Sequence, residues 1–131
     1  MNRAILLVSH GNLASTMKEC VELITGKQKH LHALSMDANE TFDSFSSQLE
    51  SSVNKLRARY QEIFILADIK GGSPCNAATL QVLIDGDVQV IAGFHLGLVI
   101  ECCLSPARPR ELIANASQSI SHINSAIERK L

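Results

Sequence analysis

The stretch LLVSHGNLAS, from Leu6 to Ser15, decides how the rest of the chain is interpreted. Its apolar run stops at Ser9 and places the titratable His10 beside Gly11. A short apolar run that ends at a glycine is typical of a buried strand followed by a turn. We therefore expect the first strand to deliver His10 at its carboxyl end.

Three further short apolar runs follow along the chain. Together with the first, they predict strands at residues 4–9, 30–36, 62–68 and 88–94. The segments between them repeat apolar residues at intervals of three and four, as amphipathic helices do. Two stripes carry this signal: Leu13, Met17, Cys20, Val21 and Ile24, then Phe42, Phe45, Leu49, Val53 and Leu56.

Strands that alternate with helices predict βαβ units. The expected fold class is α/β, a doubly wound three-layer sandwich with helices on both faces of a mainly parallel sheet. The sheet is expected to hold four strands in the order 2-1-3-4. A chain of 131 residues fits one domain spanning residues 1–131.

Several residues predict where the helices begin and end. Gly26 is expected to stop the first helix, and the second should run to about Tyr60. Ser73 is expected to cap the third helix, with Pro74 at its first position and Gly86 closing it.

The C-terminal third is expected to be helical as well. Residues 96–104, LGLVIECCL, fit a short buried helix, although the run would also serve as a strand. After the prolines at 106 and 109, one helix is expected from Glu111 to Lys130. Its inward residues would be Leu112, Ile113, Ala116, Ile120, Ile123 and Ile127.

Composition excludes several classes of protein. Lys and Arg number 12 against 13 for Asp and Glu, so no bulk charge would attract nucleic acid or an anionic membrane. We find no membrane span and no signal peptide, which predicts a cytoplasmic protein. The cysteines lack CxxC spacing and are expected to be reduced and mostly buried.

Candidate chemistry gathers at the ends of the first and third strands. In open α/β sheets, ligands bind at the carboxyl ends of strands where the strand order reverses. His10 and Asp68 would meet there, with the carboxylate fixing the imidazole tautomer. Gly71, Gly72 and Ser73 would offer backbone N–H groups to a phosphate at a helix N-terminus. Each piece alone also fits an ordinary strand end, turn or cap.

The remaining histidines give weaker signals. His30 and His32 share a strand face and could ligate a metal, but no third ligand is apparent, so no metal site is expected. His95 follows the fourth strand and could approach the same crevice, although its position favours a plain loop histidine. His122 is assigned no role.

With these motifs, the sequence resembles the IIA component of the mannose family of the bacterial phosphoenolpyruvate-dependent sugar phosphotransferase system. The resemblance rests on SHGNLA after the first strand, ITG at the end of the first helix, FILADIKGGSPCNAA after the third strand and VIAGFHLGLVIE at the fourth. It covers nearly the whole chain in the order of the family.

The resemblance implies a phosphohistidine relay without a cofactor. His10 would take a phosphoryl group from the phosphocarrier protein HPr and pass it to a IIB component, which serves sugar uptake through membrane IIC and IID components. Asp68 would hydrogen-bond the histidine. Gly71, Gly72 and Ser73 would surround the phosphate. We also expect Gly11, Lys70, Asn76 and His95 at the rim of this site, although Lys70 and His95 depart from the residues usual in the family. A homodimer is implied, in which an extra antiparallel strand can come from the partner.

The chain departs from the family where Asn-Leu-Pro-Met is common, since it has His95-Leu96-Gly97-Leu98 instead. It also lacks the linker that fuses IIA to IIB in some members, which predicts a free-standing subunit. Three alternatives remain: a phosphocarrier subunit of a dihydroxyacetone kinase, a regulatory module that senses phosphorylation, and a small-molecule binding domain on the same frame.

Overall fold

The computed structural model describes residues 2–128. Its sheet consists of β1 (Arg3–His10), β2 (Leu31–Met36), β3 (Glu62–Ala67) and β4 (Gln89–Ala92), all parallel, in the order β2-β1-β3-β4. The α/β class and the order 2-1-3-4 are therefore confirmed. Because β2 lies on one side of β1 and β3 on the other, the winding reverses between β1 and β3.

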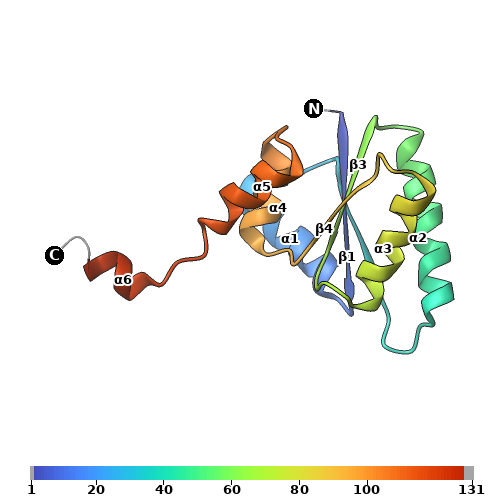
Figure 1. The fold of residues 1–131 in the computed structure, drawn as a ribbon, viewed down its shortest axis with the longest axis horizontal. Helices are drawn as coiled ribbons and strands as arrows, with labels where there is room; N and C mark the ends of the chain where they lie inside the picture. The colour runs from blue at the N-terminus through green and yellow to red at the C-terminus, as the bar shows by residue number, and fades with distance from the viewer. Residues whose placement is uncertain (1, 129–131) are drawn as a thin grey trace.

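Helices cover both faces of this sheet (Figure 1). One face packs against α1 (Leu13–Thr25), α4 (Leu96–Leu104) and α5 (Pro109–Ser117), and the other against α2 (Phe42–Arg57) and α3 (Ser73–Ile84). The last helix, α6 (Ile123–Glu128), extends away from the body of the molecule (Figure 1). No helix within residues 2–128 combines the length and apolarity needed to cross a membrane.

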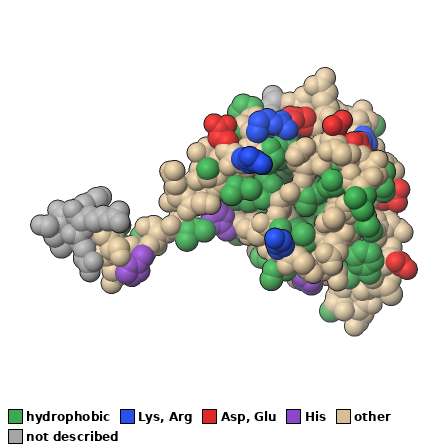
Figure 2. Space-filling view, viewed as in Figure 1, with side chains coloured by type: hydrophobic (Ala, Val, Ile, Leu, Met, Phe, Trp, Pro, Cys, Tyr) green, Lys and Arg blue, Asp and Glu red, His purple; other side chains and the backbone are tan. Residues whose placement is uncertain are grey.

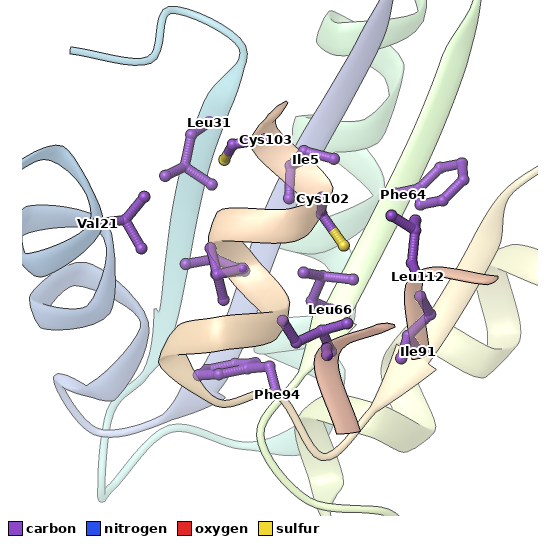
Figure 3. Close-up of a cluster of buried hydrophobic side chains, with 14 of the residues drawn as sticks. Ile5, Val21, Leu31, Phe64, Leu66, Ile91, Phe94, Cys102, Cys103 and Leu112 are labelled. Atoms are coloured by element: carbon purple, nitrogen blue, oxygen red, sulfur yellow. The ribbon is translucent and has the colours of Figure 1, made fainter. Parts of the chain in front are cut away.

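The two cores lie on opposite faces of β1, as the alternation of side chains along a strand requires. Ile5 and Leu7 belong to the core beneath α1, α4 and α5, whereas Leu6 and Val8 belong to the core beneath α2 and α3. Figure 3 shows the first of these cores. A strand buried on both faces explains the continuous apolar run that opens the sequence.

The cysteines are free, and three of the four are buried. Burial raises the pKa of Cys102 and of Cys103 to about 12, so both remain thiols at neutral pH. Cys20 is the exception, because it lies exposed on α1.

The first predicted stripe was wrong in detail. Leu13, Cys20 and Ile24 are exposed, and the buried side of α1 runs from Ala14 to Val21 with Met17 partly covered. The second stripe is buried from Phe45 to Leu56, and Phe42 lies at its exposed edge. Helix α1 has more apolar residues than its buried face can hold, so the spacing of apolar residues does not by itself predict which of them are buried.

Helix boundaries also differ from expectation. Thr41 caps α2 by accepting a hydrogen bond from the Ser44 N–H, and the helix ends at Arg57 rather than near Tyr60. Gly72, not Ser73, is the N-cap of α3, because its backbone is still extended, with φ −75° and ψ 164°. Gly26 ends α1 as expected, with φ 86°.

The expectation of one long C-terminal helix was wrong. Leu112 and Ala116 are buried as predicted, but α5 ends at Ser117 and the remaining four predicted inward residues are exposed: Ile113, Ile120, Ile123 and Ile127. The hydroxyls of Ser117 and Ser119 donate to the carbonyls of Ile113 and Ala116. Such side-chain bonds offer the backbone an alternative to continued helix. The end of the predicted helix, beyond residue 128, lies outside the described residues.

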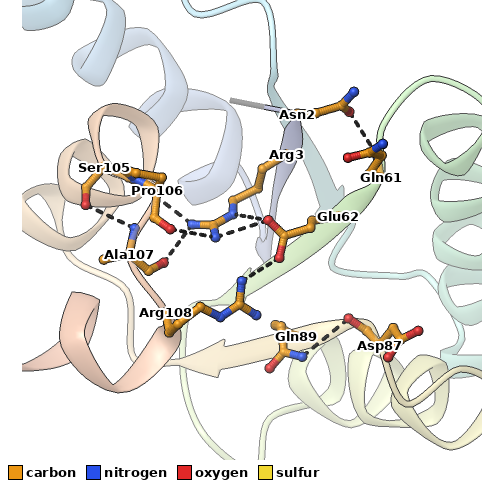
Figure 4. Close-up of polar contacts among 10 residues, drawn as sticks. All are labelled: Asn2, Arg3, Gln61, Glu62, Asp87, Gln89, Ser105, Pro106, Ala107 and Arg108. Atoms are coloured by element: carbon orange, nitrogen blue, oxygen red, sulfur yellow. Dashed lines mark hydrogen bonds and ion pairs between the residues drawn. The ribbon is translucent and has the colours of Figure 1, made fainter.

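Arg3 connects the start of the sheet to the α4–α5 link (Figure 4). Its side chain is 1% exposed, and its guanidinium lies 4.0 Å from the centre of the Phe64 ring. It donates to the Glu62 carboxylate and to the backbone carbonyls of Ser105, Pro106 and Ala107. A buried cation is tolerable here because its donors are matched by acceptors.

Candidate functional site

His10 is the last residue of β1, at the carboxyl edge of the sheet. The next N–H group, that of Gly11, donates to the Met36 carbonyl at 2.8 Å, which ends the pairing of β1 with β2. Gly11 then turns the chain with φ +53°, a conformation that glycine adopts without strain. This turn leaves the His10 side chain 54% exposed.

Ser9 fixes the turn that follows His10, a role that the sequence did not reveal. Its hydroxyl is buried, accepts a 2.7 Å hydrogen bond from the Ala14 N–H and donates to the Gly11 carbonyl. It therefore satisfies one of the N–H groups that the start of α1 leaves without a partner in the helix. A serine that ends an apolar run just before a helix was the available signal.

Asp68 holds His10 by two hydrogen bonds. Its Oδ2 atom accepts from the His10 backbone N–H at 3.0 Å and lies 2.8 Å from His10 Nδ1. An ionised carboxylate only accepts hydrogen bonds, so Nδ1 carries the proton in a neutral imidazole. The lone pair is then on Nε2, the nitrogen suited to act as a nucleophile.

The surroundings of Asp68 keep its carboxylate ionised. Burial by itself would raise its pKa, but bonds from the His10 backbone and ring and from the Ile69 N–H outweigh burial and lower it. The Asp68 N–H donates to the Val8 carbonyl, so the end of β1 and the start of the next turn are joined at this residue.

Gly71 and Gly72 are needed for different reasons. Gly71 has φ +83°, which favours glycine. Gly72 has an ordinary φ, but a Cβ built on it would lie 2.7 Å from Cε1 of His10 and 3.5 Å from its Nε2. The imidazole thus stands directly against the backbone of the glycine turn.

The α3 N-terminus lies beside the free nitrogen of His10, because Gly72 is both its N-cap and the contact of the ring. Ser73 and Pro74 begin the helix. The unpaired N–H groups and dipole of a helix start attract anions, so the position suits a phosphoryl group. The Asn76 amide donates to the Gly71 carbonyl at 3.3 Å and closes the turn, while Lys70 is exposed beside it.

The structure gives His95 contacts away from this crevice. Its Nδ1 accepts from the Leu98 N–H at 3.1 Å as the N-cap of α4, and its Nε2 lies 3.1 Å from the Ser119 hydroxyl. A Cβ on Gly97 would lie 2.5 Å from that hydroxyl. The departure at residues 95–98 therefore builds a link between α4 and the end of α5.

Comparisons with known proteins show the family and the fold of the chain. The model of the family described as PTS system fructose IIA component matches residues 4–117. The chain belongs to this family. It is a mannose-family IIA component of the sugar phosphotransferase system, as the motifs around His10 and Asp68 predict, and that system serves sugar transport.

Two curated relatives illustrate the membership of this IIA component. The sorbose-specific PTS EIIA component of Lacticaseibacillus casei is 27% identical over 119 residues, covering 91% of this chain and 81% of that protein. The mannose-specific PTS EIIAB component of Escherichia coli K12 is 27% identical over 105 residues, covering 80% of this chain but 32% of that longer protein.

Solved structures share the fold over nearly the full length of the IIA component. A PTS IIA protein associated with the fucose utilization operon of Streptococcus pneumoniae superposes with a TM-score of 0.89 at 29% identity, covering 97% of both chains. A mannose/sorbose-specific IIA subunit from Enterococcus faecalis gives a TM-score of 0.84 at 25% identity, with 93% of this chain and 95% of that one covered.

Proposed function

We propose that the protein is a phosphohistidine relay, which accepts a phosphoryl group from phospho-HPr on His10 and passes it to a IIB component. The supporting observation is the placement of His10, with Nδ1 held by Asp68 and Nε2 facing the glycine turn. Membership in the IIA family supports phosphotransferase activity in general. The relay requires no cofactor, because the histidine itself carries the group.

Each transfer exchanges one nitrogen–phosphorus bond for another. The Nε2 lone pair of His10 forms the new bond as the bond to the donor histidine breaks, and the donor nitrogen keeps that electron pair. No proton leaves Nε2, since it carries none. The Nδ1 proton stays on the hydrogen bond to Asp68, whose negative charge offsets the positive charge that the ring gains.

The glycine turn would stabilise the transferred group. The metaphosphate-like transition state spreads negative charge over three oxygens, which preorganised N–H groups stabilise without reorganisation. In this proposal the backbone at Gly71, Gly72 and Ser73 surrounds those oxygens. Lys70, exposed beside the turn, adds a positive charge at the rim.

Partners are proposed on the same basis. A groove of about 560 Å³ runs from Lys70 and Gly71 along β4 to Ile113, next to the His10 crevice. It is open enough for the surface of HPr or IIB to dock close to His10. Sugar would be handled by IIB with the membrane IIC and IID components, and we place the protein in the cytoplasm, where those transfers occur.

We also propose that the protein forms a homodimer, in which the partner subunit supplies the extra antiparallel strand. β4 is an edge of the four-stranded sheet, and Figure 2 shows hydrophobic side chains exposed on the face where β4 and α3 lie. Leu80, Leu83 and Ile84 of α3 are exposed apolar residues. Exposed apolar surface beside an unpaired strand edge is typical of an association surface.

The test is the intact mass after incubation with phosphoenolpyruvate, Enzyme I and HPr. We expect one acid-labile phosphoryl group per wild-type chain and none on His10→Ala. Asp68→Asn should be phosphorylated at least tenfold more slowly, because the neutral amide no longer fixes the imidazole tautomer or its charge. Circular dichroism of each variant checks that the fold is kept.

A His10→Ala chain that still gains the phosphoryl group would overturn the assignment of the carrier residue. Wild-type chain that gains none, with HPr itself phosphorylated, would overturn the relay. Transfer onward to purified IIB separates a relay from a regulatory module. The family match to a sugar system, rather than a dihydroxyacetone kinase, supports IIB as the acceptor to test.

A further inference from the structure

A cavity of about 290 Å³ lies between the edge strand β2 and the C-terminal half of α2. Its apolar lining comes from Leu6, Ala33 and Leu56, and its polar lining from four side chains: His32, Ser52, Lys55 and Arg59. Pockets that bind small molecules combine an apolar floor with a few converging polar groups in this way.

The cavity is separate from the His10 crevice. In the sheet, His32 pairs with Leu6, whereas Met36 pairs with His10. The cavity and the His10 crevice are therefore four residues apart along the strands, a distance of about 13 Å at the usual rise per residue. The lining of the cavity contains none of the residues assigned to phosphoryl transfer.

His32 supplies a polar atom that has no partner. Its Nε2 is buried and makes no hydrogen bond with any of the described residues. Its ring meets the Tyr60 ring edge-on, with centroids 6.4 Å apart. Buried polar atoms in proteins are nearly always paired, so His32 Nε2 leaves a hydrogen bond for a molecule in the cavity to make.

Basic groups give the cavity its charge. Ser52, Lys55 and Leu56 lie at intervals of three and four along α2, and Arg59 follows one turn later, so all four face the same way. Burial lowers the pKa of His32, and the nearby Arg59, Lys18 and His30 lower it further. The cations therefore create a positive potential at the imidazole, and none of the described residues that line the cavity carries a carboxylate.

We propose that this cavity binds a small metabolite bearing a phosphate monoester. Lys55 and Arg59 pair with the phosphoryl oxygens, and the Ser52 hydroxyl and the Nε2–H of neutral His32 donate hydrogen bonds to them. The organic part rests on Leu6 and Leu56. The opposing explanation, in which Lys55 and Arg59 only balance the negative end of the α2 dipole, predicts no ligand.

The test is the NMR signal of each histidine ring during titration with glycerol 3-phosphate, in histidine-labelled wild-type protein at constant ionic strength. A His32→Gln chain assigns the His32 signal. We expect the His32 signal to shift and saturate. The double variant Lys55→Ala/Arg59→Ala should bind at least tenfold more weakly, because it lacks both cations that pair with the phosphoryl oxygens. Both side chains are exposed and contribute charge rather than packing, so the fold should be kept. Arg110→Ala, an exposed cation outside the cavity, should bind as the wild type does.

Three results would overturn the proposal: no shift at His32, shifts confined to His10, or the same shift with sodium chloride alone. Equal binding by the double variant would also overturn it, since its fold can be verified from the amide spectrum.

Inorganic phosphate should bind at least fivefold more weakly than glycerol 3-phosphate. Equal affinity would overturn the assigned contact between Leu6, Leu56 and the organic part. Phosphorylation of His10 in the double variant should proceed at the wild-type rate, which separates the two sites.

Discussion

At the scale of one residue, Gly72 sets how closely His10 approaches the glycine turn. In Gly72→Ala, the new Cβ would lie 2.7 Å from His10 Cε1 and 2.9 Å from Ile69 Cγ2, so the ring must move. A displacement of this kind slows transfer on the order of 100-fold. The measurement is the rate of phosphorylation by phospho-HPr. Gly86→Ala is the matched control, because its Cβ would meet nothing within 4 Å.

Unchanged transfer in Gly72→Ala would contradict the proposed position of the phosphoryl group. The Gly86→Ala control should retain the wild-type rate and gain up to about 1 kcal/mol of stability from the reduced freedom of the unfolded chain.

Asp68 should make stability depend on pH. Its pKa is lower in the folded protein than its ordinary value, since the bonds from His10 and Ile69 outweigh burial. The ionised carboxylate therefore stabilises the fold fully above its ordinary pKa, and that contribution is lost as the pH falls through the folded value. We expect the difference in free energy of unfolding between wild type and Asp68→Asn to be largest near neutral pH and to shrink below about pH 4.

Urea denaturation of both chains at a series of pH values measures this difference. The control variant is Asp87→Asn, which makes the same change at the exposed Asp87 in the turn before β4. A difference for Asp68→Asn that grows as the pH falls would contradict the assigned direction.

At the scale of the element, Arg3 joins β1 to the link between α4 and α5 (Figure 4). Arg3→Met keeps most of the aliphatic length but leaves the carbonyls of residues 105–107 without their donor. We expect a loss of about 3 kcal/mol in the free energy of unfolding, measured by urea denaturation.

The neighbouring Arg108 gives a matched control, because it pairs with the same Glu62 carboxylate but its side chain is 59% exposed. Arg108→Met should cost less than about 1 kcal/mol, as exposed ion pairs usually do. Equal costs for the two variants would mean that the buried bonds of Arg3 do not hold this link.

At the scale of the whole molecule, the extended C-terminal segment tests the proposed homodimer. Ile120, Ile123 and Ile127 are 72%, 61% and 53% exposed on a segment that leaves the body of the chain (Figure 1). Such exposed apolar side chains would gain burial against another molecule. We expect the triple variant Ile120→Ser/Ile123→Ser/Ile127→Ser to shift from dimer to monomer, as measured by size-exclusion chromatography with light scattering.

Leu23→Ser is the control, since it removes an even more exposed apolar side chain, 86% exposed, from α1. It should leave the dimer intact. A monomeric wild type, or a triple variant as dimeric as the wild type, would exclude this segment from the interface.

The fold and the meeting of His10 with Asp68 follow from local signals in the sequence. Apolar runs mark strands buried on both faces, and parallel strands bring their carboxyl ends to one edge of the sheet. The side chains that follow the first and third runs therefore had to meet once the strand order was 2-1-3-4. The glycines of the turn were recognisable in the sequence, because glycine is the residue that accepts a positive φ or a close approach to the backbone.

Contacts between distant segments decided the rest, because they depend on which surfaces meet. Helix α5 ends at Ser117, and the Ser119 hydroxyl beyond it contacts His95 from another element, which no local periodicity reveals. Arg3 became a core residue only because three carbonyls from residues 105–107 converge on it. The sequence by itself thus determined the strands and the placement of His10 and Asp68 at strand ends, since these follow from repeating local patterns. Only the tertiary structure decided which apolar residues of α1 and of the C-terminal segment, and which polar residues, are buried, because burial there depends on the surfaces that pack together.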